Sequence, residues 1–143
     1  LLRTEPPKLN PFSFFKRWQT GEKTSVTCMV TSGTPPLKFV WMKDGKELSE
    51  QSSNLRVKHE PGYSMLFIEP VELLSGGNYT CVVKNRAGLD SYTTFLDVEA
   101  PPKWVKTMGD GKIAYGSEAK LQCQASGSPV PTVRWQRFDG KHL

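Results

Sequence analysis

The interval between a cysteine and the next tryptophan is repeated in this chain of 143 residues. Trp41 follows Cys28 by 13 positions, and Trp135 follows Cys123 by 12. Each cysteine lies in a run in which apolar and polar residues alternate, which is the pattern of a half-buried β-strand. A repeated interval in the same kind of strand indicates two copies of one structural unit.

The first copy is complete. It adds Cys81, which lies 53 positions after Cys28, and Tyr79, which lies two positions before Cys81. A tyrosine at that place ties the start of a strand to the preceding turn, as in immunoglobulin domains. The pattern predicts an all-β fold of tandem immunoglobulin-like (I-set) β-sandwiches, the second incomplete. The predicted core residues are Trp41, Tyr79, Leu66, Ile68 and Trp135.

Alternation and turn residues place the strands of the first copy. They are expected over residues 9–15, 24–30, 39–43, 55–59, 65–69, 78–85 and 92–99, and Pro11 is expected to break the first of them. In the second copy, strands are expected around Cys123 and at 133–135.

Two prolines mark a boundary between the copies. We expect residues 1–99 to form domain 1, residues 100–102 a short proline linker, and residues 103–143 the N-terminal part of domain 2. Because an immunoglobulin domain has about 100 residues, we expect about 45–55 further residues to complete domain 2 beyond the given sequence.

The paired cysteines have two possible roles, a disulfide or a metal site. A metal site needs Cys and His ligands at short spacing, and the two histidines, His59 and His142, are not near a cysteine in sequence. We therefore predict a disulfide between Cys28 and Cys81 with Trp41 packed against it, and no metal or other cofactor. A structural disulfide indicates an extracellular protein or one of the secretory pathway.

Charge and motifs argue against several function classes. The net charge is +5, but seven of the 19 basic residues and only three of the 14 acidic residues lie from Pro101 onward, without an arginine run. Neither nucleic acid nor a small-molecule substrate is expected as a partner. The chain has no nucleophile motif and no phosphate-binding loop, so no enzyme activity and no catalytic residue are predicted.

Three segments resemble one family more specifically than the cysteine pattern does. They are Pro6–Phe12, the junction Ala100–Pro101–Pro102–Lys103–Trp104, and the run Tyr115–Cys123 followed by Gly127–Pro131. Together they resemble tandem domains of arthropod Dscam, the Down syndrome cell adhesion molecule family. The resemblance is to its variable immunoglobulin domain 7 and the domain after it, or to the first two domains of the shortened chelicerate forms. One departure is Ser75, six positions before Cys81, where I-set domains usually carry an aspartate that forms a salt bridge.

The resemblance implies a cell-surface function. It implies the extracellular part of a single-pass plasma-membrane protein that binds copies of the same isoform by antiparallel pairing of like domains. Isoform identity would be read from residues on strand faces that differ between alternative exons. Two other functions remain open: a heterophilic cell-surface receptor, and a structural array of the muscle type.

Alternation also predicts which side chains face outward. If Val26, Cys28, Leu66 and Ile68 point inward, their neighbours on the same strands point to solvent. We predict an antiparallel two-fold homophilic contact through this face, in which Glu69 pairs with Arg56 or Lys58. The alternative is scattered surface hydrophobes, or a shifted register that turns these residues inward. The predicted interface residues are Thr27, Met29, Arg56, Lys58, Met65, Phe67 and Glu69.

The opposite sheet carries a glycosylation signal. Asn78–Tyr79–Thr80 is an N-glycosylation sequon, and the asparagine is expected to point outward. A glycan on Asn78 would obstruct the apolar outward positions of that sheet. The alternative is that packing of the adjacent Tyr79 keeps Asn78 unmodified. The outward apolar positions are Val40, Met42, Val82 and Phe95.

Overall fold

The computed structural model describes residues 3–49, 52–109 and 111–138. The chain divides into two compact units, unit 1 (Leu1–Glu99) and unit 2 (Ala100–Leu143). Each is described by itself.

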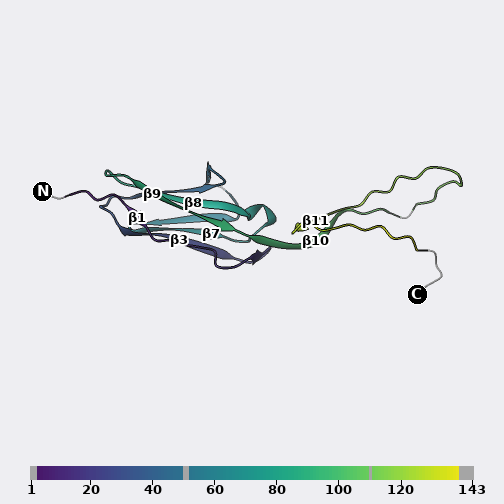
Figure 1. Cartoon of the computed structure of the whole chain (residues 1–143), viewed down its shortest axis with the longest axis horizontal. Coiled ribbons are helices and arrows are strands. Elements are labelled where there is room, and N and C mark those ends of the chain that lie inside the picture. The colour runs from purple at the N-terminus through teal and green to yellow at the C-terminus, as the bar shows by residue number, and fades with distance from the viewer. Residues whose placement is uncertain (1–2, 50–51, 110, 139–143) are drawn as a thin grey trace. The chain divides into compact units, whose positions relative to one another are not determined.

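Unit 1 is a sandwich of two four-stranded antiparallel sheets, as predicted (Figure 1). The sheets are named here the first sheet, with strand order β1-β3-β7-β6, and the second sheet, with order β5-β4-β8-β9. The first sheet consists of β1 (Lys8–Leu9), β3 (Thr24–Ser32), β7 (Tyr63–Ile68) and β6 (Leu55–Glu60). The second consists of β5 (Lys46–Glu47), β4 (Lys38–Lys43), β8 (Gly77–Lys84) and β9 (Leu89–Leu96).

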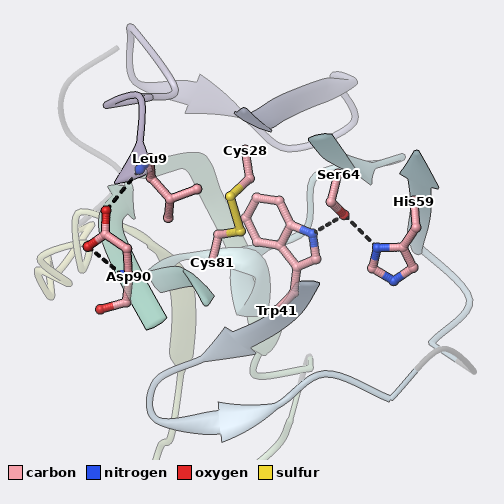
Figure 2. The surroundings of a disulfide bond; sticks show 8 residues. Leu9, Cys28, Trp41, His59, Ser64, Cys81 and Asp90 are labelled. Carbon is pink, nitrogen blue, oxygen red and sulfur yellow. Dashed lines mark hydrogen bonds between the residues drawn. A yellow bond between two sulfur atoms is a disulfide. The ribbon is translucent and has the colours of Figure 1, made fainter. Parts of the chain in front are cut away.

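The disulfide joins the two sheets across the core. Cys28 of β3 and Cys81 of β8 are bonded, with an S–S distance of 2.03 Å, and both are completely buried. Trp41 of β4 lies beside the sulfurs (Figure 2) and is 3% exposed. The remaining buried apolar side chains of both sheets pack in the same cluster, among them Leu66 and Ile68. The predicted disulfide is therefore confirmed, and four of the five predicted core residues are buried.

A polar chain satisfies the indole nitrogen of the core tryptophan. Trp41 Nε1 donates a hydrogen bond of 2.8 Å to Oγ of the buried Ser64, which in turn lies 3.0 Å from His59 Nδ1 (Figure 2). An indole N–H buried without an acceptor would cost about 1–3 kcal/mol. Ser64 therefore allows Trp41 to fill the core without that loss, and His59 extends the chain to the edge strand β6.

Tyr79 forms the predicted tyrosine corner. Its hydroxyl donates a 2.6 Å hydrogen bond to the carbonyl oxygen of Ser75, at the end of the short 3-10 helix η1 (Leu73–Ser75). The Ser75 hydroxyl accepts the N–H of Glu72 and lies 3.3 Å from Asn54 Nδ2. Ser75 is the position where the resemblance leads us to expect an aspartate in a salt bridge. In this chain its neutral hydroxyl is hydrogen-bonded instead.

The first strand expected over residues 9–15 is wrong in its extent, although the break expected at Pro11 is present. Only Lys8 and Leu9 pair with β3, and the chain forms a second short strand, β2 (Trp18–Gln19), parallel to the start of β10 (Val98–Lys106). Phe14 between them is buried, while Phe15 has φ of +68° and is exposed. A proline cannot donate to a ladder and a residue at positive φ bends the backbone, so the segment crosses between strands instead of extending one.

Unit 2 differs more from expectation. Within its described residues, one antiparallel pair forms, between the 100–106 part of β10 and β11 (Gln124–Ser128). Residues 119–123 and 133–135 are not strands. The prediction of Trp135 as a core residue is wrong, because its side chain is 54% exposed, and Cys123 is a free thiol. A tryptophan of this kind is buried only between two sheets, and the described residues of unit 2 supply one strand pair.

The disulfide should supply a large part of the stability of unit 1. It closes a loop with a sequence separation of 53, for which the chain-entropy model gives about 4 kcal/mol. Replacing Cys28 and Cys81 together by alanine should lower the free energy of unfolding by about that amount, measured by urea denaturation. The matched control is Cys123→Ala, which removes the free thiol of unit 2. An equal loss in the control would contradict the assignment.

The tyrosine corner should make stability depend on alkaline pH. Burial, and secondarily the Asp44 carboxylate, raises the pKa of the Tyr79 phenol. The folded state therefore keeps a proton that the unfolded state releases near pH 10, so stability falls as pH rises above about 10. Tyr79→Phe should cost about 1–3 kcal/mol at pH 7, and the deficit should shrink above pH 10. Tyr92→Phe, at a half-exposed site, is the control. A pH-independent deficit would exclude titration of Tyr79 as the cause.

Candidate recognition surface

The outer side of the first sheet, named here the recognition face, carries three rows of side chains. Each row takes one residue from β3, one from β7 and one from β6, because directly paired residues of neighbouring strands share a face. The strand registers give the rows Ser25–Phe67–Arg56, Thr27–Met65–Lys58 and Met29–Tyr63–Glu60.

The predicted register is correct. Val26, Cys28, Leu66 and Ile68 are buried, and the residues between them lie on the opposite side of their strands. The structure brings six of the seven predicted interface residues together on the recognition face: Thr27, Met29, Arg56, Lys58, Met65 and Phe67. The alternative of a shifted register is thereby excluded.

Glu69 is the seventh predicted residue, and it lies just beyond the end of β7. Its backbone N–H donates to the carbonyl oxygen of Asn54, and a cis peptide bond joins it to Pro70. It is exposed but belongs to none of the three rows. The chain turns here because the strand ladder ends at Ile68.

The apolar side chains of the recognition face are only partly exposed. Met29 is 46% exposed, whereas Met65 and Phe67 are half-buried. The guanidinium carbon of Arg56 lies 4.2 Å from the centre of the Phe67 ring, so the cation covers the aromatic face. The face is therefore an apolar centre on β7 that is covered along one side by the long polar side chains of β6.

The charges of β6 on the recognition face change sign once along the strand. Arg56 and Lys58 are followed by Glu60, and the Lys58 Nζ to Glu60 Oε1 distance is 3.6 Å. Both side chains of this ion pair are partly exposed, so the pair contributes little stability and is free to exchange partners. One end of β6 is thus positive and the other negative.

Three residues of this face, Ser25, Tyr63 and Glu60, are absent from the predicted interface. The strand expected at this place begins at Met65. The turn signal Pro61–Gly62 ends just before Tyr63, so the strand could have been expected to begin there. Extending the period of two by one step toward that turn would have placed Tyr63 outward. Its pairing partner on β6, Glu60, follows from the hairpin register.

The outer side of the second sheet carries the predicted apolar residues and the sequon. Val40, Met42 and Val82 are half-buried, and Phe95 is 60% exposed. Asn78 lies directly opposite Phe95 in the register of β8 and β9. Its side chain is exposed, while its backbone N–H donates to Asp44 Oδ1. The neighbouring Tyr79 points into the core, so its packing does not cover the asparagine.

Other chemistry finds little support in the described part of the chain. It contains no group of three or more His, Cys, Asp or Glu residues that could hold a metal ion. No helix within it is long and apolar enough to cross a membrane.

The sequence matches a family model twice. Residues 14–98 and 102–143 each match the immunoglobulin I-set domain. The two matches meet close to the division between units 1 and 2.

Relatives and solved structures point the same way. The chain is 35% identical over 135 residues to the cell adhesion molecule Dscam2 of Drosophila melanogaster, covering 94% of this chain and 6% of that protein. A structure of the N-terminal eight immunoglobulin domains of DSCAM is 36% identical with a TM-score of 0.65, covering 95% of this chain and 18% of that one. The Dscam1 Ig7 domain, isoform 5, is 33% identical with a TM-score of 0.62, covering 65% and 96%. The predicted resemblance to Dscam is thus confirmed, and the chain spans about one-sixteenth of the length of Dscam2.

Proposed function

The chain belongs to the immunoglobulin I-set family, and on that premise we propose that it binds identical copies of itself through the recognition face. The chain is an immunoglobulin segment of the extracellular adhesion type, as its relatives are cell adhesion molecules. That family of molecules is non-enzymatic, so the prediction that the chain is not an enzyme is confirmed by its relatives.

The observation that carries the proposal is the order of side chains on the recognition face. Consider two copies whose recognition faces meet. They are related by a two-fold axis that lies between the first sheets of the two copies, parallel to these sheets and at right angles to their strands. This axis keeps the order of the strands and reverses their direction, so the contact is antiparallel and isologous. The row Thr27–Met65–Lys58 then faces its own copy, and each outer row faces the other outer row.

The outer rows are complementary in this arrangement. Phe67 of one copy faces Tyr63 of the second copy, an aromatic contact at both ends of the interface. Arg56 faces Glu60 of the second copy, and this pair occurs twice. Glu60 therefore takes the part that the sequence analysis gave to Glu69. Lys58 faces Lys58 of the second copy, and this repulsion is reduced because each is already paired with its own Glu60.

Isoform specificity follows from the same arrangement. Exchanging the charges of both outer rows keeps opposite charges paired twice between identical copies. When an exchanged copy meets an unexchanged one, like charges face one another at both places. The proposal therefore includes isoform-specific recognition, in which residues of β3, β6 and β7 determine which copies bind.

The proposed location is the extracellular part of a single-pass plasma-membrane protein. The Cys28–Cys81 disulfide supports an oxidising compartment. The adhesion function of the relatives supports the cell surface.

A structural array of the muscle type is the second candidate. It is favoured by the likeness to a titin fragment, I67-I69, which is 29% identical with a TM-score of 0.64 and covers 87% of this chain and 44% of that one. Such an array requires no symmetric contact through the recognition face, and neither does a heterophilic receptor. Self-association through this face therefore separates both from the proposed function.

Placing a charge at the centre of the recognition face should abolish self-association. Met65→Asp and Phe67→Asp each place two carboxylates in the apolar centre of the two-fold contact, and we expect the dissociation constant of the dimer to rise at least about tenfold. Sedimentation velocity over a concentration series measures it. Phe95→Asp makes the same kind of change on the exposed side of the second sheet and should leave the dimer intact. A Met65→Asp protein that dimerises like the wild type would refute this choice of face.

Exchanging the charges of β6 should change which copies pair. Arg56→Glu alone and Glu60→Arg alone each set like charges opposite one another twice, so each variant should dimerise about tenfold or more weakly than the wild type. A mixture of the two variants restores opposite charges at both places and should form a heterodimer. The variant carrying both exchanges should again form a homodimer. If the mixture stays monomeric while the single variants remain folded, the antiparallel register is wrong.

A further inference from the structure

The second sheet has an outward face that the homophilic contact does not use. At one end of it, two exposed side chains lie directly opposite one another, Asn78 on β8 and Phe95 on β9. Their neighbours Tyr79 and Leu96 are completely buried, which places Asn78 and Phe95 on the solvent side of the sheet. Side chains paired in this way have Cβ atoms about 4.5–5.5 Å apart.

Asn78 is placed for modification. It begins the sequon Asn78–Tyr79–Thr80, and because the sequon lies in an extended strand, Asn78 and Thr80 share one face. The Asn78 backbone is held by reciprocal hydrogen bonds with Asp44, whose carboxylate accepts the Asn78 N–H at 2.9 Å and whose N–H donates to the Asn78 carbonyl at 2.8 Å. These contacts use the backbone and leave the exposed side-chain amide available as the acceptor of a glycan.

Phe95 has the character of a sugar-binding surface. It is 60% exposed on the outward side of this sheet, where Val40, Met42 and Val82 are half-buried. The other strongly exposed apolar residue on this side, Leu89 (63%), lies at the opposite end of β9. The C–H faces of a pyranose ring are apolar and pack against aromatic rings, and an aromatic side chain offers a large apolar area for such packing. A sugar attached to Asn78 therefore starts on the residue that is directly paired with Phe95.

We propose that Asn78 carries an N-linked glycan whose first N-acetylglucosamine packs against Phe95. The glycan covers this end of the second sheet and removes Phe95 from the surface available to protein partners. Recognition is thereby restricted to the first sheet. The inference depends on the proposed function only through passage of the chain along the secretory pathway, and it does not require that the chain dimerise.

The site also explains how an exposed aromatic residue is tolerated. β8 and β9 are held together by a backbone ladder of eight residue pairs, and the hydroxyls of Thr80 and Thr93 lie 2.7 Å apart beside the site. Phe95 is therefore not needed for the pairing of these strands. A sugar that packs on the ring adds stability that is absent from the bare polypeptide.

The test is a double-mutant cycle on the chain, secreted from kifunensine-treated mammalian cells so that its glycans remain high-mannose. Intact mass should show one glycan on the wild type and on Thr80→Ser, which keeps the sequon, and none on Asn78→Gln. Phe95→Thr should lower the melting temperature by several degrees in the glycosylated protein but only slightly in the Asn78→Gln background. Trimming with endoglycosidase H, which leaves the first sugar, should preserve this difference.

Two outcomes would overturn the inference. A secreted wild-type chain with the mass of the bare polypeptide would exclude the modification. An equal effect of Phe95→Thr with and without the glycan would exclude packing of the sugar on the ring. Sedimentation of the trimmed protein reports the homophilic contact separately, so failure of the proposed function is distinguished from failure of this site.

Discussion

The Cys28–Cys81 disulfide, with Trp41 beside it, is the contact on which the rest of unit 1 depends. It joins the central strands of the two sheets, and so fixes which side of each strand is inside. Because side chains alternate along a strand, fixing the two cysteines as inward also fixes the residues next to them, and every second residue from there, as outward. The two proposed surfaces of this chain follow from that choice, since both are made of the residues that the core excludes.

The two outward faces have different chemistry. The recognition face combines an apolar strip on β7 with charges on β6 that change sign from Arg56 to Glu60. Such a face is complementary to its own copy turned by half a rotation. The outer face of the second sheet has an exposed phenylalanine opposite a sequon asparagine. One face is suited to a protein partner and the other to a carbohydrate, although both belong to the same sandwich.

The regular strands of unit 1 were predictable because periodicity is a local property. The burial of Leu66 and the outward position of Met65 need only the period of two and one anchored residue. The break at Pro11 was predictable from the sequence, but the new pairing at Trp18 and Gln19 was not, because it depends on which distant strand offers a pairing edge. Trp135 was misplaced for a related reason. A spacing motif predicts burial only where a second sheet is present to bury it.

The sequence by itself determined the fold class, the disulfide and six residues of the recognition face, because each depends on spacing along the chain. Only the tertiary structure decided which of those residues interact. Glu60 rather than Glu69 lies in the charge row, Arg56 covers Phe67, and Phe95 lies opposite Asn78. These relations join different strands, so they depend on strand register and on where each strand ends. Both are set by packing between segments that are distant in sequence.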